Sequence, residues 1–406
     1  MYCRLCSGKN LYKFLDLGFT PPADQFRRME QLKEPSIHYP LDVYMCEDCG
    51  LAQLGHIVSP EILYRYDYPY ESSTTNTGKK HFHSFASSVV EEFGFGKNDL
   101  AVDVGSNVGV LLDGFKMQGL RVLGVDPATN IVRIAEKRGI ETINEFFSRE
   151  IANKIVKEKG KASVITATNV FAHIDDLQNF MLAVKNLLKD NGVFIIEAPH
   201  FLHLIKNLEY DTIYHEHLSY VSVEPLVPFF KKFNLEIVKV EQKDIHGGSI
   251  RIFVSKNNKY PVHSSVFKTI ALEKKHTLRK KITLDNFSKK VQENREELLW
   301  LLRKLKKEGK RIVGVSAPAK GMTLLNYCKI GRETLDYVTE KSSLKIGRFT
   351  PGDHIPVYPD SKLMDDKPDY ALLLAWNFSK EIMENLKQFQ KKGGKFIIPI
   401  PKPKII

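Results

Sequence analysis

The chain has 406 residues, of which 43% are hydrophobic and 27% are charged, and its formal net charge is +12. This length predicts two or three domains, and the composition is that of a globular protein. No apolar run approaches the roughly 18 residues that span a bilayer, and the N-terminal residues do not resemble a signal peptide. We therefore expect a cytoplasmic protein with no membrane partner.

The positive charge is compatible with either nucleic acid or an anionic small molecule as a partner. Much of it consists of dispersed lysines, as in residues 272–281 and 387–404. Dispersed lysines are more typical of a solvated face than of a nucleic-acid-binding stripe, and the sequence contains no basic–aromatic recognition module. We therefore expect no nucleic-acid partner.

Four of the five cysteines form two Cys-x-x-Cys pairs near the N-terminus. Each pair fits a knuckle that presents two thiolates to one tetrahedral ion, and the intervening residues 11–43 must fold back to bring the pairs together. Two disulfides are disfavoured in the cytoplasm, and the paired spacing argues against four idle thiols. The sequence therefore predicts a structural zinc ion, because four thiolates leave no open coordination position. The predicted ligands are Cys3, Cys6, Cys46 and Cys49.

A tyrosine-rich segment, residues 62–74, follows the cysteines. Its tyrosines alternate with other residues from Tyr64 to Tyr70, and Pro69 interrupts them, so the segment makes a poor helix and an unusual strand. It could cover a pocket and offer phenol groups to a ligand. It could equally pack one domain against another, and the residues alone favour neither alternative.

Residues 100–112 contain the most informative turn of the chain. They read as a buried strand ending at Asp103, a tight turn with Gly105 and Gly109, and the start of a helix. Glycines let the backbone approach a ligand closely, and the amides of a helix N-terminus can donate to a carboxylate or phosphate. The pattern therefore predicts a ligand at this turn.

The next strand indicates which ligand. A dinucleotide fingerprint would need glycine at positions where this chain has Asn107 and Val110, so NAD fits poorly. The apolar residues 121–125 end at Asp126, and a carboxylate at the end of a strand can accept both hydroxyls of a ribose. An ordinary strand–turn–helix with a solvated Asp is the alternative. Turn and carboxylate together resemble the cofactor site of class I S-adenosylmethionine-dependent methyltransferases, which implies cofactor contacts for Asp103, Gly105, Asn107, Gly109, Asp126 and Asn169.

Short apolar strands then alternate with helices. Strands are expected at residues 162–167, 193–197, 235–240 and 249–254, with an amphipathic helix at 177–188. This alternation predicts a doubly wound, mostly parallel α/β sheet, which binds its ligands at the carboxyl ends of the strands.

Two histidine-bearing segments fall at those carboxyl ends. His173 follows the strand at 162–167, and Tyr214-His-Glu-His217 follows the strand at 193–197 after a short helical stretch. Histidine can take a proton at neutral pH, and a neighbouring carboxylate can orient it. A zinc-protease helix would need its two histidines four residues apart, and these are two apart, so we discount a metal site here.

Taken together and in order, the motifs resemble those of the sugar C-methyltransferases that act on nucleotide-linked keto-deoxysugars, and the resemblance covers essentially the whole chain. Besides the cysteine pairs they are Tyr-x-Tyr-x-Ser-Ser, Gly-Ser-Asn-x-Gly, Asn-Val-x-Ala-His, Tyr-x-Glu-His, His-Gly-Gly-Ser-x-Arg and Ser-Ala-Pro-x-Lys-Gly. One departure is that Val108 and Val110 stand where the family pattern has Asp and Thr. The catalytic positions implied by the resemblance are Tyr68, His173, Tyr214, Glu216 and His217.

Within these positions we expect His217 to be the base and Glu216 to orient or polarise it, while the tyrosines and His173 hydrogen-bond an oxyanion or sugar hydroxyls. If the segment were extended, His215 and His217 would face the same side, so spacing alone does not separate them. The family pattern has its histidine directly after the Glu, which favours His217.

The C-terminal third repeats the earlier pattern. Residues 268–307 show a long, charged helical pattern, and residues 311–325 again read as strand, small-residue turn and helix. Further parallel strands are expected at 335–338, 370–374 and 395–399. A second Rossmann-like unit is therefore predicted, whose turn places Lys320 beside backbone amides as a diphosphate cradle. The alternative is a structural half-domain with ordinary charged loops, and Cys328 is predicted to lie in its core.

The family resemblance favours binding of the sugar nucleotide. The implied substrate-binding residues are His246, Gly247, Arg251, Lys320, Lys345 and Arg348.

The sequence thus predicts an α/β protein in three parts: a zinc-binding domain with an aromatic linker at 1–75, a class I methyltransferase Rossmann-like doubly wound sheet at 76–260, and a second Rossmann-like α/β domain at 261–406. The resemblance implies an S-adenosylmethionine-dependent C-methyltransferase that acts on a nucleotide-diphosphate-linked 4-keto-6-deoxy sugar by proton abstraction beside the ketone, enolate formation and methyl transfer.

Two rival functions remain at this point. The zinc knuckles and the basic charge suggest an RNA or protein methyltransferase, which strong and steeply salt-dependent RNA binding would favour. A non-catalytic, zinc-nucleated binding module would bind a nucleotide sugar without ever consuming the methyl donor.

Overall fold

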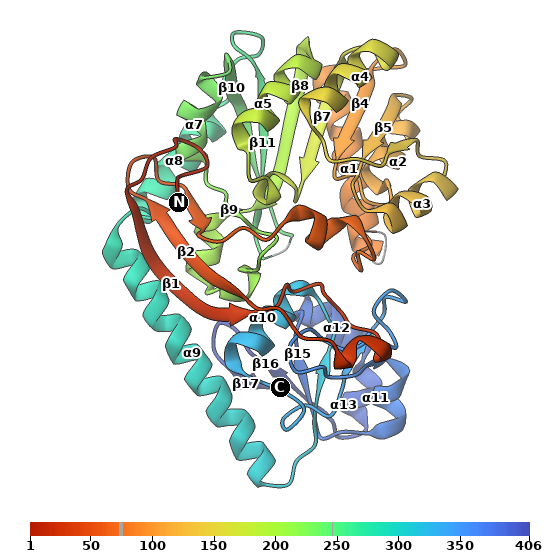
Figure 1. Ribbon diagram of the computed structural model, residues 1–406, viewed down its shortest axis with the longest axis vertical. Helices are drawn as coiled ribbons and strands as arrows, with labels where there is room; N and C mark the ends of the chain where they lie inside the picture. Colours follow the sequence, from red (N-terminus) through yellow and green to blue (C-terminus); the bar gives the residue numbers. More distant parts are fainter. Residues whose placement is uncertain (73–75, 246) are drawn as a thin grey trace.

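The structure, a computed structural model, describes residues 1–72, 76–245 and 247–406. It contains three sheets, of four, seven and six strands (Figure 1). Each of the predicted segments, 1–75, 76–260 and 261–406, contains one of these sheets. One strand of the middle segment, however, belongs to the N-terminal sheet. The exact boundaries of the segments stay a prediction. Among the helices of the described residues, none is both long enough and apolar enough to cross a membrane.

The four-stranded N-terminal sheet is antiparallel and includes a strand from the middle of the chain. It contains β1 (Leu11–Thr20), β2 (Tyr39–Cys46) and β3 (Ala52–Leu54) in that order. Its last strand, β9 (Ser219–Tyr220), pairs with β3 and begins directly after the segment that carries His217. That segment is therefore fixed to the cysteine-bearing part by backbone hydrogen bonds.

The middle sheet has the order β10-β11-β8-β7-β4-β5-β6. Its strands are β4 (Leu100–Val104), β5 (Arg121–Val125), β6 (Thr142–Ile143), β7 (Ala162–Thr168), β8 (Leu188–Pro199), β10 (Leu235–Lys243) and β11 (Ser249–Lys256). The strands from β4 to β8 pair in parallel, and β11 is antiparallel to both β8 and β10. The predicted doubly wound, mostly parallel sheet is confirmed, and its chain order reverses between β4 and β7, where such sheets bind their ligands.

Helices cover both faces of this sheet (Figure 1). They are α1 (Asn76–Phe93), α2 (Val110–Met117), α3 (Thr129–Lys137), α4 (Arg149–Lys159), α5 (Leu177–Leu187) and α7 (Val223–Lys231). The short helix α6 (Phe201–Asn207) packs instead in the core cluster that contains the N-terminal sheet. The α1 and α2 helices approach closely at Gly114, where a Cβ would lie 2.9 Å from the Cβ of Ala86. This contact packs the middle of α1 against the middle of α2.

The C-terminal sheet has the order β14-β13-β12-β15-β16-β17. Its strands are β12 (Ile312–Val315), β13 (Val338–Glu340), β14 (Val357–Pro359), β15 (Tyr370–Leu373), β16 (Lys395–Ile398) and β17 (Lys404–Ile405). Its helices are α10 (Ala319–Cys328), α11 (Ser361–Asp366), α12 (Ser379–Asn385) and α13 (Lys387–Lys391). All pairs except β16–β17 are parallel, so a second Rossmann-like unit is present, with its own reversal of strand order between β12 and β15.

The long helical pattern forms two helices rather than one. They are α8 (Ser264–Lys275) and α9 (Lys281–Lys307), and the left-handed φ of +50° at Thr277 separates them. The α9 helix runs from the N-terminal hairpin to the C-terminal part (Figure 1). Phe287 of α9 packs against Phe14 of β1, and both belong to a core cluster that continues into the C-terminal sheet. This shared core joins the outer two parts of the molecule.

Candidate active site

The four N-terminal cysteines form one compact sulfur cluster. The Sγ atoms of Cys3 and Cys49 lie 3.4 Å apart, those of Cys6 and Cys46 lie 3.6 Å apart, and all four lie within 4.8 Å of one another. A tetrahedral zinc ion with Zn–S bonds of about 2.3 Å needs sulfur separations of about 3.8 Å, so the cluster fits zinc. Four thiolates fill the coordination shell, and the ion would therefore stabilise this part of the fold.

Two equivalent turns build the cluster. The amide of Ser7 donates to the carbonyl oxygen of Cys3, and the amide of Gly50 donates to that of Cys46, both at 2.8 Å. Ser7 and Gly50 have φ angles of +62° and +88°. A left-handed residue after each Cys-x-x-Cys pair thus closes each knuckle, which explains the glycine after the second pair.

The glycine turn lies at the crevice of the middle sheet, between β4 and α2. Gly105 and Gly109 have φ angles of +67° and +78°, and a Cβ on Gly109 would lie 2.9 Å from Cγ1 of Ile140. Both positions therefore require glycine. The two valines that depart from the family pattern, Val108 and Val110, are buried in an apolar cluster beside the turn, so both side chains belong to the core there.

Asp126 closes the turn from the side of β5. Its Oδ2 accepts the amide of Asn107 at 2.8 Å, and its Oδ1 accepts the amide of Ala128 at 2.9 Å. A carboxylate has about four lone-pair sites, so two remain for the ribose hydroxyls of a nucleoside. Asp103 accepts the hydroxyl of Thr166 at 2.6 Å, and burial raises the pKa of Asp103 to about 7. This arrangement fits the adenosine part of S-adenosylmethionine.

Two asparagines tie the tyrosine-rich segment to the turn. The side chain of Asn107 accepts the amide of Ser72 at 2.9 Å and donates to the carbonyl of Tyr70 at 3.1 Å. The side chain of Asn130 holds the amide and the carbonyl of Tyr68 in the same way, at 3.1 and 2.9 Å. Residues 68–72 of the segment therefore lie over the glycine turn, and the side chain of Asn107 binds them there.

The predicted catalytic rings lie together beside this segment, which itself contributes Tyr68. The ring centroid of His217 is 4.0 Å from that of Tyr214 and 5.2 Å from that of His173. Tyr64 stacks on His173 at 5.8 Å and meets Tyr68 at 5.7 Å. Burial raises the pKa of Tyr64, Tyr68 and Tyr214 well above the usual value of a tyrosine. Burial also lowers the pKa of His173 well below the usual value of a histidine. The phenols are therefore protonated donors, and His173 is neutral.

Residues 214–217 form a turn, which separates the two histidines. The amide of His217 donates to the carbonyl of Tyr214 at 2.9 Å, and Nδ1 of His217 lies 2.8 Å from the carbonyl oxygen of Thr212. His215 faces the N-terminal sheet instead, with Nε2 3.3 Å from the carbonyl oxygen of Tyr39. The structure thus brings His217, and not His215, to the ring cluster.

Glu216 lies where the three parts of the chain meet. It is 2% exposed, and among the described residues its Oε2 has no hydrogen-bond partner. Burial, and then the charge of Asp24, raise the pKa of Glu216 to about 8. Lys345, a predicted substrate-binding residue, bonds Asp24 at 3.0 Å and the carbonyl of Ala317 at 2.8 Å. Glu216 is therefore protonated near neutral pH, beside a buried ion pair between the outer two parts.

The other two predicted cations of the C-terminal part also face the rest of the molecule. Nζ of Lys320 lies 3.5 Å from Oδ2 of Asp211 and 4.1 Å from the ring centroid of Trp376, whose Nε1 donates to Asp211 at 2.7 Å. Arg348 holds both carboxylate oxygens of Asp67, at 2.9 and 2.8 Å. Lys320 and Arg348 thus lie at the junction, each beside a carboxylate of another part.

The His-Gly-Gly-Ser-x-Arg motif is placed elsewhere. His246 lies outside the described residues, and Gly247, with a φ of +91°, packs against the carboxylate of Glu209. Arg251 is 2% exposed and donates to Glu197 at 2.8 and 2.7 Å inside the middle sheet. A direct contact of Arg251 with substrate would require this buried pair to open.

Sequence reasoning did not single out several residues that serve the site. Asp24 and Asp67 are single acids whose partners, Lys345 and Arg348, are far away in the chain, so no local pattern marks them. Thr212 acts through its backbone carbonyl, which no side-chain motif reveals. Asn130 had a usable signal, because it lies in the first turn of the helix that follows Asp126.

Comparison with known proteins identifies related families. Three family models match the chain: a zinc-binding domain at residues 3–64, a methyltransferase domain at 79–240 and a C-methyltransferase C-terminal domain at 244–401. The C-methyltransferase NovU of Streptomyces niveus is 35% identical over 405 residues, which cover 100% of this chain and 96% of NovU. The predicted zinc site and the predicted cofactor, S-adenosylmethionine, are confirmed at this level.

Other proteins resemble a smaller share of the chain. A ubiquinone biosynthesis O-methyltransferase of Pasteurella multocida is 31% identical over 110 residues, 24% of this chain and 45% of that protein. Among solved structures, an S-adenosylmethionine-dependent methyltransferase from Clostridium acetobutylicum overlaps 44% of this chain and 92% of its own, with 17% identity and a TM-score of 0.36. Since NovU aligns with the chain from end to end, the chain belongs to the C-methyltransferase family of NovU, as a zinc-binding and S-adenosylmethionine-dependent member.

Proposed function

We propose that the chain methylates the carbon beside the ketone of a nucleotide-diphosphate-linked 4-keto-6-deoxy sugar, with His217 as the base. A carbon beside a ketone is not nucleophilic until it loses a proton, so a C-methyltransferase needs a base and a group that stabilises the enolate. The bound cofactor supplies the electrophilic methyl group. The remaining chemistry belongs to the side chains of the ring cluster.

The hydrogen bond between His217 and Thr212 is the observation that carries the proposal. A carbonyl oxygen can only accept, so Nδ1 of His217 carries the proton, and in the neutral ring the basic lone pair is on Nε2. Tyr68 and Tyr214, both protonated donors, can stabilise the enolate oxygen. A base and oxyanion donors are thus available within one cluster.

The C-terminal part supports a nucleotide-linked substrate. Open parallel sheets bind ligands where their strand order reverses, which here is at the carboxyl ends of β12 and β15. Lys320 lies in the first turn of α10, directly after β12, and Arg348 faces the tyrosine-rich segment through Asp67. Both cations are placed to exchange their carboxylate partners for a diphosphate between the two Rossmann-like sheets.

Incubation with a labelled methyl donor and a panel of keto-sugars tests the proposal. The panel contains thymidine-, uridine- and guanosine-diphosphate-linked 4-keto-6-deoxy sugars, together with the corresponding sugars without a nucleotide and a sample of bulk RNA. We expect mass spectrometry to find the label on a carbon next to the ketone of at least one nucleotide sugar. Label on RNA, on oxygen, or equally on sugars without the nucleotide would contradict the proposal.

A further inference from the structure

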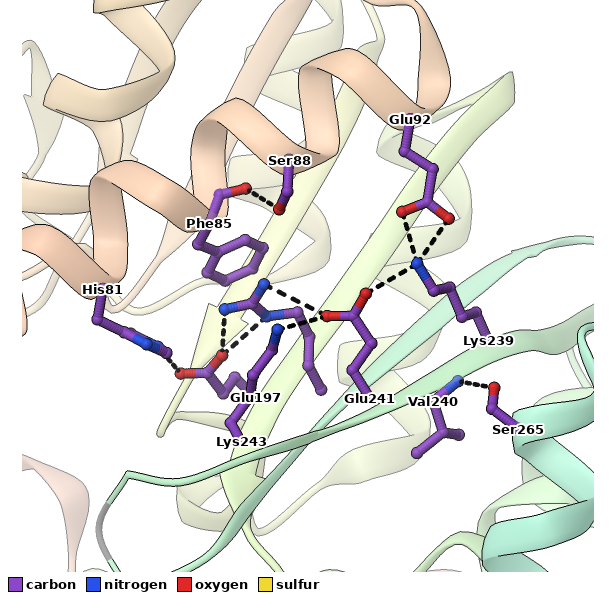
Figure 2. Close-up of polar contacts among 11 residues, drawn as sticks. His81, Phe85, Ser88, Glu92, Glu197, Lys239, Val240, Glu241, Lys243 and Ser265 are labelled. Carbon is purple, nitrogen blue, oxygen red and sulfur yellow. Dashed lines mark hydrogen bonds and ion pairs between the residues drawn. The ribbon is translucent and has the colours of Figure 1, made fainter.

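A chain of charged side chains lies beside α1 in the middle part of the molecule (Figure 2). Arg251 of β11 donates to Oε2 of Glu197 from Nε at 2.8 Å and from Nη2 at 2.7 Å. Its guanidinium carbon lies 3.4 Å from the ring centroid of Phe85 on α1. On the other side of Glu197, Nε2 of His81 lies 2.6 Å from Oε1. Glu197 is therefore held between Arg251 and His81.

The positive and negative charges among these side chains cancel without any contribution from His81. Glu241 lies 3.6 Å from Arg251, 2.8 Å from Lys239 and 2.7 Å from Lys243, and Lys239 also lies 2.7 Å from Glu92. Burial by itself raises the pKa of Glu197, but the hydrogen bond with His81 and the charge of Arg251 hold that pKa below its ordinary value. An ionised carboxylate at this distance orients an imidazole and stabilises its charged form. The three cations Arg251, Lys239 and Lys243 are therefore matched by three carboxylates, those of Glu197, Glu241 and Glu92.

His81 lies next to the glycine turn. The α1 helix begins four residues after Ser72, whose amide is bound to Asn107 of the turn. Phe82, the neighbour of His81, packs against the apolar cluster that contains Val108. The packing of Phe82 holds the second turn of α1 beside the glycine turn, at the carboxyl edge of the middle sheet.

Glu197 approaches the same crevice from β8. Its carbonyl oxygen accepts the amide of Asn169, the residue that follows β7, at 2.7 Å. The crevice already contains two buried acids, Asp103 and Asp126. The amino-acid end of S-adenosylmethionine carries a carboxylate, which these acids would repel, so a cation beside that carboxylate would offset the repulsion.

We propose that His81, held by Glu197 and Arg251, binds the carboxylate at the amino-acid end of S-adenosylmethionine. In the imidazolium form, Nε2–H is donated to Glu197 and Nδ1–H is donated to the ligand carboxylate. Glu197 and Arg251 are positioning residues, because they act on the ligand through His81. The arginine of the His-Gly-Gly-Ser-x-Arg motif would then serve the cofactor indirectly, through Glu197 and His81.

The binding of two ligands to the wild type and to a His81 variant tests this role. Calorimetry measures the affinity of the full-length, zinc-loaded protein for S-adenosylhomocysteine and for its decarboxylated analogue, which lacks the carboxylate. A charged hydrogen bond is worth about 1.5–3 kcal/mol, so we expect the wild type to prefer S-adenosylhomocysteine by about 10- to 150-fold. His81→Gln should remove most of this preference while leaving the affinity for the analogue close to that of the wild type.

His83→Gln is the matched control, because His83 lies on the same helix two residues further on, on its partly exposed surface beside Lys79 and Lys80. It should keep the wild-type preference. A His81→Gln protein that retains the wild-type preference, or that loses affinity for both ligands by the same factor, would overturn the proposal. Thermal unfolding checks the fold of each variant, and His81→Asn provides a second replacement if the first is unstable.

The positioning role of Glu197 has its own readout. Glu197→Gln should lower the preference for S-adenosylhomocysteine over the analogue, because a neutral amide does not stabilise an imidazolium. Glu197→Asp should restore part of the preference. Equal preferences in the wild type and in Glu197→Gln would show that Glu197 has only a structural role. These titrations contain no sugar, so their outcome is independent of the substrate proposed above.

Discussion

Nδ1 of His217 lies 2.8 Å from the carbonyl oxygen of Thr212. This contact fixes both the orientation of the ring and the nitrogen that carries the proton, so that Nε2 is the basic atom of the neutral ring. His215 is turned toward the N-terminal sheet by its own contact with a backbone carbonyl, that of Tyr39. The two histidines of one short motif therefore have different surroundings, and variants of each can be compared directly.

Removal of one cysteine ligand should release the zinc ion. Cys46→Ala leaves three thiolates in the sulfur cluster, and we expect the zinc content to fall from one ion per chain to nearly none, with unfolding mainly of the N-terminal sheet. Metal analysis and limited proteolysis measure these two effects. Cys328→Ala is the control, because Cys328 is buried in the C-terminal part, away from the cluster. Freshly purified wild-type protein without zinc would refute the site.

Loss of the Asp126 carboxylate should weaken cofactor binding. We expect Asp126→Ala to reduce the affinity for S-adenosylmethionine by about 1.5–3 kcal/mol, the range for a hydrogen bond to a charged group. Isothermal titration calorimetry measures this loss. Glu136→Ala removes an exposed carboxylate from α3 and should bind as tightly as the wild type. If the affinity of Asp126→Ala is unchanged, the ribose is held elsewhere.

Glu216 should make the stability of the protein depend on pH. Burial and the charge of Asp24 raise its pKa from 4.5 to about 8 in the folded state, so the folded protein binds the Glu216 proton more tightly than the unfolded chain. The stability contributed by this proton is complete below the unfolded pKa and is lost as the pH rises through the folded pKa. Glu216→Gln keeps a neutral side chain at every pH.

We therefore expect the free energy of unfolding of the wild type to fall relative to that of Glu216→Gln as the pH rises from about 4.5 to about 8. Urea unfolding of both proteins across this range measures the difference. Glu136→Gln alters an exposed glutamate, and its free energy of unfolding should differ from that of the wild type by the same amount at every pH. A constant difference for Glu216→Gln as well would mean that Glu216 has an ordinary pKa.

The parts of the fold that the sequence predicted are those governed by local patterns. The apolar run of β4, the glycines at 105 and 109 and the acid at the end of β5 follow one another within a short stretch, where residue type and spacing mark each of them. The cysteine pairs are equally local, because each knuckle closes through its own backbone. These features were predictable for that reason.

The features that were not predicted depend on contacts between distant segments. The pairing of β9 with β3 brings the middle part of the chain into the N-terminal sheet, and the pair Lys345–Asp24 joins residues that are 321 positions apart. Arg251 was expected at the substrate because of its motif, but the motif does not show that Glu197 and Phe85 enclose it. Burial of a charged side chain becomes visible only when its partners are known.

Solvent deuterium exchange into the keto-sugar, in the absence of a methyl donor, tests the central claim most directly. It reports proton removal beside the ketone separately from methyl transfer. We expect the wild type and His215→Asn to exchange at similar rates. His217→Asn should lose exchange by at least about 100-fold, the lower end of the contribution of a general base, while it still binds S-adenosylhomocysteine. Exchange by His217→Asn at the wild-type rate would show that another group is the base.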